Sequence, residues 1–405
     1  MHVCKARMVV LGLSLLGGIA SGCHKLGSRR DPQSQSATVA RADAPRRLPR
    51  IDSHAHIQSE GLERAMALMS EWGIDGRVNL SGGYPGPPRH TLERQLAMAR
   101  SSGGRVAVFA NVNFTKAVRT RRDYGTALAE ELSVAKDMGA VGLKIPKGLG
   151  LGYLGPDGER VLPVDDPGLD PLFEEAGELG MPVVIHTGDP KAFWQPLDSH
   201  NERIDELRAH PEWSFYGQPV PSWSELYAQF ERRVARHPKT VFIGAHFGND
   251  PEDPDRVGQM LDRYPNLFID TAARVPEIGR QDPVKMRQFF AKYQDRILFG
   301  TDLGVGSTQD DMMYGSNGPF SPTLADERRF FESTWRYFET NDRQFESPTP
   351  IQGSWKIDGI GLPESVLRKL YFDNAARLLH WKPPLAGVVA AAGTGGAHGA
   401  EAMPP

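Results

Sequence analysis

The stretch Arg50-Ile51-Asp52-Ser53-His54-Ala55-His56 carries two imidazoles two positions apart. On an extended strand, residues at this spacing point to the same side, so both histidines can reach one metal ion. Three later apolar runs also end in a side chain that binds metals: 183–186 ends in His186, 241–246 in His246, and 297–302 in Asp302. The pattern predicts four strands whose ends converge on one site.

Eight short apolar or β-branched segments occur between residues 50 and 302, most of them separated by stretches of helical periodicity or helix length. The predicted strands are 50–56, 76–80, 105–111, 140–145, 182–186, 240–246, 266–271 and 296–302. The predicted helices include 61–72, 91–101, 125–138, 169–179, 222–237, 251–264, 283–293 and a final helix at 363–381. Alternating buried strands and amphipathic helices indicate a parallel sheet.

Eight such units close most naturally into an α/β fold of the (β/α)8 TIM barrel type, with the active site at the C-terminal ends of the strands. The candidate metal-binding side chains all fall at such ends. A doubly wound open sheet is the alternative, but it would hardly bring strands one, five, six and eight to a common point.

The N-terminal residues 1–23 are typical of an export signal, with basic Lys5 and Arg7 followed by an apolar run that is too short to span a bilayer. The run ends in Ala20-Ser21-Gly22-Cys23, which resembles the lipobox of bacterial lipoproteins, with Ala20 at the usual position of leucine. We therefore expect Cys23 to be lipidated; an uncleaved membrane anchor is the alternative. Since His24 is not acidic, we expect a lipid-anchored protein of the cell envelope at the outer membrane, on its periplasmic side or surface.

Three further segments follow the expected signal. Residues 24–49 have almost no apolar side chains and are expected to form a flexible tether; residues 50–382 form the barrel, and the Ala-, Gly- and Pro-rich tail 383–405 is expected to be disordered. The other cysteine, Cys4, lies inside the signal, so no disulfide is expected. Charge is nearly balanced, with 47 basic against 50 acidic residues, which argues against nucleic acid as a partner. The expected partner is a small-molecule substrate.

Two long loop insertions are expected, after strand five (187–221) and after strand eight (303–362). Both are rich in aromatic residues, among them Trp194 in the first. Loops on this face of a barrel line the substrate pocket, so Trp194 is a candidate substrate contact. Alternatively, these aromatic side chains give long loops a small core of their own.

The motif D-x-H-x-H at 52–56, the strand-end residues His186 and His246, and Gly300-Thr301-Asp302 together resemble the amidohydrolase superfamily. The likeness is closest to its amidohydrolase-related branch, which includes the aminocarboxymuconate-semialdehyde decarboxylase-like enzymes. The segment 371–379 is similar to a helix common in that branch, and the resemblance covers about residues 50–381.

Neutral imidazoles from His54, His56 and His186 with the Asp302 carboxylate suit one divalent ion, Zn²⁺ above all, with a position left open for water. Such an ion lowers the pKa of bound water toward about 7. The resemblance implies that Asp302 both contacts the ion and accepts the proton from that water. His246 is the candidate for a second acid or base, or for the group that polarises the substrate oxygen; it could instead be a ligand.

Lys144 stands at the end of strand four, where binuclear members of the superfamily carry a carboxylated lysine that bridges two metals. The resemblance leaves this binuclear site open as an alternative. An uncarboxylated Lys144 would bind an anionic substrate group or pair with a neighbouring carboxylate. Arg274 could hold a substrate carboxylate, or it could simply begin a surface loop. Asp52 is expected to hydrogen-bond a histidine ligand or to cap a turn, and Asp189 is a further candidate.

The favoured function is therefore a metal-dependent hydrolase that attacks the carbonyl of an amide, lactone or ester with metal-activated water. The alternative is a metal-dependent nonoxidative decarboxylase (a lyase) of an unsaturated or aromatic carboxylic acid, because the related branch contains such enzymes with the same ligands. A third possibility is a binding protein without catalytic activity. It is the least favoured, because such a protein is expected to lack at least one of the five site residues, and all five are present here.

Overall fold

Eight parallel strands form the centre of the fold. The computed structural model describes residues 47–87, 90–120 and 122–385. The strands are β1 (Ile51–Ile57), β2 (Gly76–Asn79), β3 (Val106–Ala110), β4 (Gly142–Ile145), β5 (Val183–Ile185), β6 (Phe242–Gly244), β7 (Leu267–Asp270) and β8 (Ile297–Leu298). Each pairs in parallel with the next one along the chain. All eight predicted strands are confirmed, with ends that shift by a few residues.

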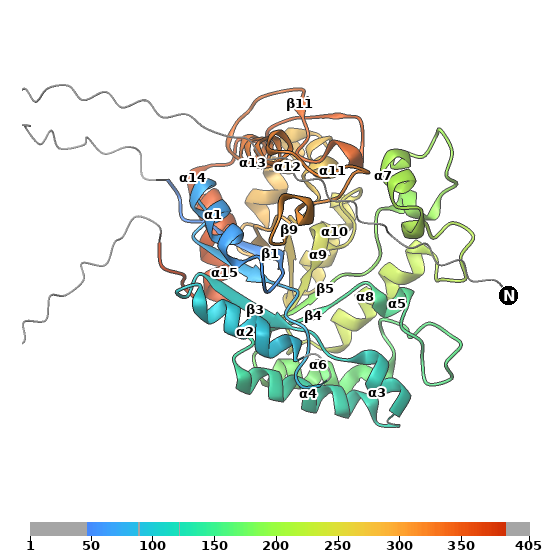
Figure 1. The fold of residues 1–405 in the computed structure, drawn as a ribbon. Helices are drawn as coiled ribbons and strands as arrows, with labels where there is room; N and C mark the ends of the chain where they lie inside the picture. The colour runs from blue at the N-terminus through green and yellow to red at the C-terminus, as the bar shows by residue number, and fades with distance from the viewer. Residues whose placement is uncertain (1–46, 88–89, 121, 386–405) are drawn as a thin grey trace, which may run out of the picture. The chain divides into compact units, whose positions relative to one another are not determined.

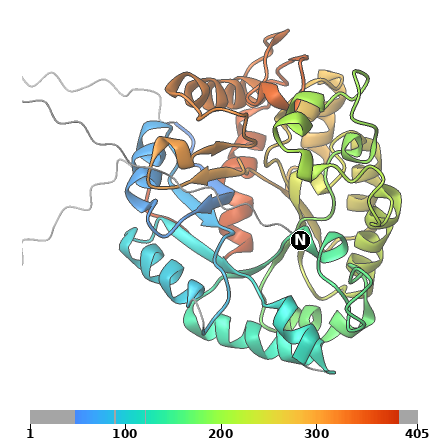
Figure 2. The same cartoon turned by 45° about the vertical axis from the view of Figure 1, so that its right-hand side comes forward.

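The ring closes between the last strand and the first. The Ser53 amide donates to the Phe299 carbonyl at 2.8 Å, and the Asp302 amide donates to the His54 carbonyl at 2.8 Å. The chain then adds β9 (Leu303–Val305), parallel to β1, and β10 (Met313–Tyr314), antiparallel to β9. Figure 2 shows the strands surrounded by helices. The predicted (β/α)8 TIM barrel is confirmed, and the C-terminal strand ends lie together at one mouth.

Helices cover the outside of the strands (Figure 1). They are α1 (Leu62–Glu71), α2 (Thr91–Ser101), α3 (Phe114–Thr120), α4 (Tyr124–Met138), α6 (Asp170–Glu178), α8 (Trp223–Arg236), α10 (Pro254–Arg263) and α12 (Pro283–Lys292). Their buried faces follow the helical period; in α8, for example, Leu226, Phe230 and Val234 are buried. All of them except the short α3 were predicted from this periodicity.

Local sequence determines where two of these helices begin. Asp253 and Asp282 each accept a hydrogen bond from the amide three residues on, and each is followed by a proline at the first helical position. An aspartate cap satisfies a free amide, and proline has no amide to leave unsatisfied, so the pair favours a helix start. This places the start of α10 at Pro254, three residues after the predicted start at residue 251.

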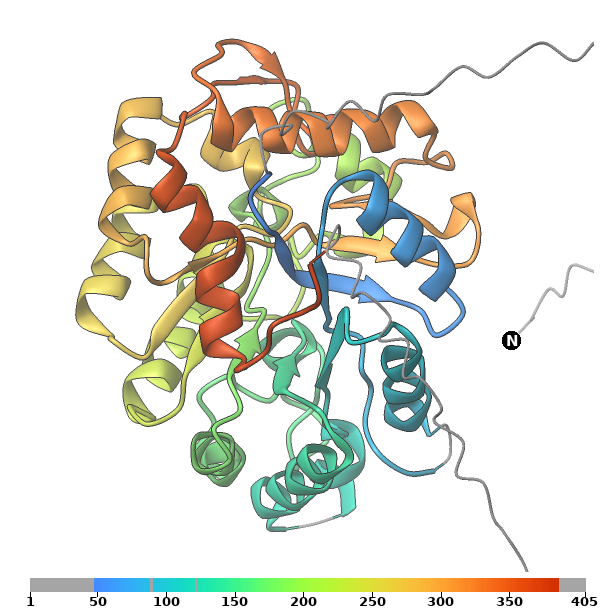
Figure 3. The same ribbon diagram turned by 90° about the vertical axis from the view of Figure 1, so that its left-hand side faces the viewer.

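The C-terminal helical segment packs beneath the barrel. It consists of α14 (Glu364–Arg368), a π-helical turn (Lys369–Asp373) and α15 (Asn374–Leu378), and Figure 3 shows it in red. Phe372, Ala375 and Leu379 join the apolar cluster of the barrel interior. Gly76, the first residue of β2, leaves no room for a side chain, because a Cβ there would meet Trp381 and Pro383. The helix therefore closes the end of the barrel opposite the mouth.

Two long connections lie at the mouth. The one after β5 contains α7 (Ile204–Ala209) and 3-10 turns at Lys191–Trp194 and Pro211–Trp213. The one after β8 contains β10, α13 (Leu324–Glu339), β11 (Phe345–Glu346), β12 (Lys356–Ile357) and a 3-10 turn at Pro350–Gln352. They meet where the Ser316 hydroxyl donates to Glu206 at 2.5 Å. The short elements α5 (Gly148–Leu151), α9 (Ala245–Gly248) and α11 (Val275–Gly279) follow β4, β6 and β7.

The described residues extend slightly beyond the predicted barrel. Arg47, placed by prediction in the tether, forms a two-pronged ion pair with Asp75 at 2.9 Å, and Leu385 packs against the barrel interior cluster. The predicted signal with Cys23, most of the predicted tether, and residues 386–405 of the predicted tail lie outside the described residues. Within the described residues, no helix is long and apolar enough to cross a membrane.

Candidate active site

An irregularity in β1 turns both of its histidines toward the mouth of the barrel. The pairing of β1 with β2 shifts register between Asp52 and Ala55. Ile51 packs into the barrel interior, whereas Ala55 and Ile57 are buried without forming part of the site. An extra residue in one strand re-aims the side chains that follow it. His54 and His56 therefore point to the same side, as the sequence predicted.

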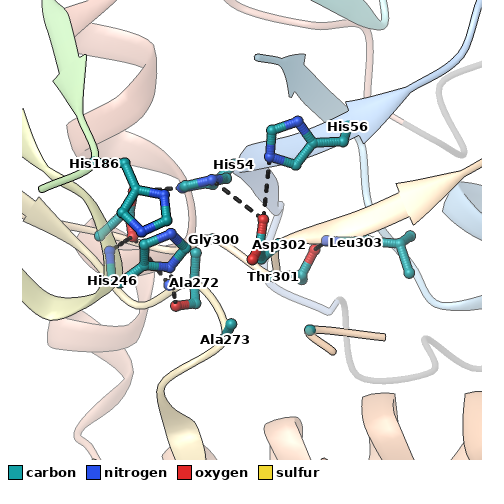
Figure 4. Close-up of polar contacts among 12 residues, drawn as sticks. His54, His56, His186, His246, Ala272, Ala273, Gly300, Thr301, Asp302 and Leu303 are labelled. Atoms are coloured by element: carbon teal, nitrogen blue, oxygen red, sulfur yellow. Dashed lines mark hydrogen bonds and ion pairs between the residues drawn. The ribbon is translucent and has the colours of Figure 1, made fainter. Parts of the chain in front are cut away.

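Asp302 meets both of these histidines. Its Oδ1 lies 3.3 Å from His54 Nε2 and 3.2 Å from His56 Nε2, as Figure 4 shows. The residue adopts the left-handed conformation, with φ 62°, which aspartate tolerates better than most residues. Gly300 allows this approach, since a Cβ there would lie 2.8 Å from the Cβ of His54. The ligand atoms of His54, His56 and Asp302 all lie within 4.8 Å of one another and could hold a metal ion.

Asp270, at the end of β7, holds two of the histidines, and sequence reasoning assigned it no role. Its Oδ2 lies 2.8 Å from His54 Nδ1, and its Oδ1 accepts the amides of His246 and Ala272 at 2.8 and 3.1 Å. The side chain is 1 % exposed. Its position was the available signal, since it ends a predicted strand as the other site residues do.

Asp52 holds the backbone of the site. Its carboxylate accepts the amide of His54 at 3.3 Å and the amide and hydroxyl of Thr301 at 3.0 and 2.7 Å, and it pairs with buried Arg77. As expected, Asp52 hydrogen-bonds a candidate histidine ligand, but it does so through the backbone amide of His54, because Asp270 occupies the position beside the His54 ring. Asp52 also joins β1 to the end of β8 through Thr301.

The imidazoles form a continuous row. Ring centroids are 5.4 Å apart between His56 and His54, 4.9 Å between His54 and His246, and 4.3 Å between His246 and His186. His246 Nδ1 lies 3.0 Å from the Ala272 carbonyl. Since a carbonyl only accepts, His246 carries its proton on Nδ1, and its Nε2 keeps a free lone pair.

His186 stands at the far end of this row. Its Nε2 lies 3.5 Å from Asp189 Oδ1, and Asp189 Oδ2 accepts a hydrogen bond from Lys147 at 2.8 Å. His186 does not join the group of three ligand atoms formed by His54, His56 and Asp302. The structure thus brings all four predicted metal-binding residues to one mouth and places three of them within mutual ligand distance.

Lys144 projects from β4 into the same site and is 4 % exposed. Its Nζ has no hydrogen-bond partner among the described residues. Burial lowers the pKa of Lys144 to about 8, although Asp270 and Asp302 act in the opposite direction. The amine is thus a buried cation that loses its proton more readily than an exposed lysine.

A cavity of about 250 Å³ opens above these groups. Its lining includes His56, Lys144, His186, His246 and Asp302, together with Lys147, Asp189, Phe193, Glu206, Trp213, Arg274 and Gln352. Trp194, the predicted substrate contact, is absent from this lining, and its indole donates to the Pro221 carbonyl at 3.0 Å. The neighbouring Phe193 and Trp213 form the aromatic wall instead.

Aromatic residues after β8 have a structural role. Tyr314, Phe330, Phe331, Tyr337 and Phe338 are buried in the core between α13 and the barrel. None of them lines the cavity, and they pack into the same apolar core as the barrel rather than into a separate core of the connection.

Arg274 is a cation in the cavity wall. It is 7 % exposed, and its Nη1 donates to the Ala273 carbonyl at 2.9 Å. Among the described residues, no carboxylate forms an ion pair with it. A buried guanidinium without a carboxylate can bind the carboxylate of a ligand. The alternative of a surface arginine at the start of a loop is therefore excluded.

Burial determines the charge of the histidines. It lowers the pKa of His56, lowers that of His186 to about 4, and lowers that of His246 well below the usual value. For His54, burial acts in the same direction, but Asp270 and other acceptors outweigh it and raise the pKa. Burial acts to raise the pKa of Asp302, but the adjacent imidazoles of His54 and His56 hold it well below its usual value. Near neutral pH, His56, His186 and His246 are therefore neutral imidazoles beside the Asp302 carboxylate.

These shifts predict how the stability of the metal-free protein depends on pH. The folded-state pKa of His186 is about 4 and its usual value is 6.5, so the unfolded chain binds more protons between these values. The contribution of neutral His186 to the free energy of unfolding is at most about 3 kcal/mol. It is fully present above pH 6.5 and is lost as the pH falls toward 4. The free energy of unfolding, measured with denaturant at pH 7.5 and at about pH 4.5, should therefore differ less between the two pH values in His186→Asn than in the wild type. His200→Asn, at an exposed position, is the control. An undiminished pH effect in His186→Asn would contradict the prediction.

Comparison with known proteins gives one family match. The family model described as amidohydrolase matches residues 51–381, most of the chain. No curated protein matches the chain. Among solved structures, the chain is similar to 2,6-dihydroxybenzoate decarboxylase from Rhizobium, with 18 % identity over 82 % of this chain and 99 % of that one and a TM-score of 0.48.

Two further structures have lower identities. For 5-carboxyvanillate decarboxylase from Sphingomonas paucimobilis, identity is 14 % over 83 % of this chain and 100 % of that one, with a TM-score of 0.46. For a probable 2-pyrone-4,6-dicarboxylic acid hydrolase from Acinetobacter baumannii, identity is 13 % over 82 % of this chain and 99 % of that one, with a TM-score of 0.42. The family match itself spans every strand of the barrel and all the site residues described above. The chain belongs to the amidohydrolase family.

Proposed function

We propose that the protein is a metal-dependent hydrolase in which His54, His56, His186 and Asp302 hold one divalent ion. Enzymes of the amidohydrolase family depend on metal ions, and the group of His54, His56 and Asp302 suits one. The donor set of imidazole nitrogens and one carboxylate favours Zn²⁺.

The orientation of His54 is the observation that carries this proposal. Asp270 accepts the proton of Nδ1, which leaves the lone pair of Nε2 directed at Asp302. That Nε2 and the Nε2 of His186 are both buried and form no hydrogen bond. A buried nitrogen without a partner is costly, and a histidine that donates its other ring proton to a carboxylate is typical of metal ligands.

A bound divalent ion would polarise a substrate carbonyl and lower the pKa of water. The chain's own groups then move the protons. Asp302, ionised because its pKa is low, accepts the proton of the attacking water. His246 is neutral, with the lone pair of Nε2 free, so it serves as a second base and, once protonated, as the acid for the leaving group.

The cations of the cavity indicate the substrate. Arg274 and Lys144 both line the cavity and lack a carboxylate partner in an ion pair within the described part of the chain. We propose that they bind an anionic group of the substrate, an amide, lactone or ester that carries a carboxylate. The binuclear alternative, with a carboxylated Lys144 and His246 as a further ligand, predicts a second ion.

Nonoxidative decarboxylation is the second candidate, and Arg274 is the observation that favours it. A decarboxylase holds the departing carboxylate against a cation, and the bond electrons that stay on carbon then take up a proton. Phe193 and Trp213 provide flat walls that suit an unsaturated or aromatic acid. Both reactions use the same ligands, so the products must distinguish them.

The experiment begins with metal content per chain, measured by elemental analysis of the purified protein. We expect about one Zn²⁺; two would support the binuclear site, and none after reconstitution would refute the metal centre. Carboxylated lactones, esters and amides and aromatic carboxylic acids are then tested in ¹⁸O-labelled water. Incorporation of ¹⁸O into a new carboxylate supports hydrolysis, whereas release of CO₂ supports decarboxylation.

Arg274→Gln should raise the KM for the substrate found in this way by about 10- to 100-fold, because one charge-assisted hydrogen-bonded pair is lost. Loss of affinity should be smaller for an analogue that lacks the carboxylate. Arg280→Gln is the matched control, since Arg280 pairs with Glu202 and does not line the cavity. Equal effects of Arg274→Gln on both compounds would contradict the role of Arg274.

A further inference from the structure

The chain after β6 makes a left-handed turn at the mouth of the barrel. His246, Phe247, Gly248 and Asn249 all have positive φ, at 55°, 60°, 68° and 64°. Each left-handed residue other than glycine costs roughly 1–2 kcal/mol, so such a run requires support from its surroundings. The Asn249 amide, which donates to the Ala245 carbonyl at 2.8 Å, closes the turn.

The side chain of Asn249 supplies part of that support and reaches across to β5. Its Oδ1 accepts the Thr187 amide at 2.8 Å, and its Nδ2 donates to the Ile185 carbonyl at 3.4 Å. These two backbone groups lie on either side of His186. The amide of His186 itself donates to Ile145 of β4 at 3.0 Å, and Asn249 is only 6 % exposed.

Other links between the same two loops lie farther along. The Lys191 ammonium pairs with Asp250 at 2.8 Å, and the Lys191 amide donates to Glu252 at 2.9 Å. Lys191 stands five residues after His186. Asn249 is therefore the residue that connects the turn carrying His246 to the peptide groups that flank His186.

We propose that Asn249 is a positioning residue that holds His186 against His246, at the ring separation of 4.3 Å. Rotation of the Ile185–Thr187 backbone would move the imidazole of His186. The side-chain amide of Asn249 forms hydrogen bonds with both ends of that segment, which opposes the rotation. The expected effect of Asn249 on the binding of a metal ion rests on the proposed function, whereas its effect on the position of the His186 ring does not.

Two substitutions separate the backbone of Asn249 from its side chain. Asn249→Gly keeps the left-handed conformation without strain and removes the amide. Asn249→Asp also tolerates this conformation and keeps the acceptor for Thr187. Asn374→Ala is the matched control, because Asn374 is 1 % exposed and its amide donates to the carbonyls of Gln294 and Ile297 at the other end of the barrel.

We expect Asn249→Gly to bind Zn²⁺ about 10- to 100-fold more weakly in competition with a chelator, as when an outer partner of a ligand is lost. Asn249→Asp should recover most of the affinity. Asn374→Ala should lower the melting temperature and leave the affinity unchanged. Wild-type affinity in Asn249→Gly would overturn the proposal, as would loss of affinity in Asn374→Ala equal to that in Asn249→Gly.

Metal-free protein provides the measurement that is independent of the proposed function. The ring Cε1–Hε1 resonance of His186, assigned with His186→Asn, should be single in the wild type and in Asn249→Asp. It should broaden or split in Asn249→Gly, and the Thr187 amide should lose its protection from hydrogen exchange there. If the wild type binds no Zn²⁺, the metal centre fails, and an unchanged His186 resonance in Asn249→Gly would then overturn the positioning role by itself.

Discussion

Asp302→Asn should bind Zn²⁺ at least about 100-fold more weakly than the wild type. Loss of a residue that only hydrogen-bonds a ligand costs about 10- to 100-fold, and loss of a ligand itself should cost more. Asparagine matches aspartate in shape and tolerates the left-handed φ of 62° at this position, so the backbone should stay in place. The substitution removes the one charge that both His54 Nε2 and His56 Nε2 approach. It also removes a base, which contributes about 10²- to 10⁴-fold to turnover.

The measurement is chelator competition for Zn²⁺, followed by turnover of the substrate that the wild type accepts. Asp311→Asn is the control in the same connection, since Asp311 accepts hydrogen bonds from Thr308 and lies outside the cavity. His56→Ala tests the same centre from β1, at a side chain that is 30 % exposed, so its removal leaves no cavity in the core. Wild-type affinity in both Asp302→Asn and His56→Ala would refute the ligand set.

The fold could be predicted because its strands and helices differ in period. Runs such as Val183–Ile185 are buried on both faces and read as continuous apolar segments, whereas α8 shows one apolar stripe. The segment after β8 resisted prediction. There Phe330, Phe331, Tyr337 and Phe338 belong to α13 and pack inward, and sequence does not show which surface a helix in a long connection will cover.

The site could be predicted where a strand end fixes the direction of a side chain. His54, His56, His186, His246 and Asp302 all come together at one mouth for this reason. The position of Trp194 could not be predicted, because successive residues of the 3-10 turn Lys191–Trp194 point in different directions, and Phe193 lines the cavity instead. The contacts of Asp52 and Asp270 depend on the register of β1 with its neighbours, which the irregularity after Asp52 changes.

Asp270→Asn should weaken Zn²⁺ binding by about 10- to 100-fold even though Asp270 is not among the proposed ligands. A carboxylate accepts all three hydrogen bonds at this position, from His54 Nδ1 and from the amides of His246 and Ala272. Asparagine has one accepting oxygen, which the two amides would take. Its amide nitrogen would then face His54 Nδ1 and donate to it.

This donation reverses the tautomer of His54. With Nδ1 acting as the acceptor, the ring proton moves to Nε2, and the lone pair that faces Asp302 is lost. The change should appear in the ¹⁵N chemical shifts of the His54 ring in metal-free protein, together with the weaker binding of Zn²⁺. Asp52→Asn is the informative comparison, because Asp52 is equally buried at the same strand ends but bonds the backbone of His54 and Thr301 rather than a ring. It should lower the melting temperature without reversing the tautomer. An Asp270→Asn protein that kept both the wild-type tautomer and the wild-type affinity would show that Asp270 supports only the loops and not the orientation of His54.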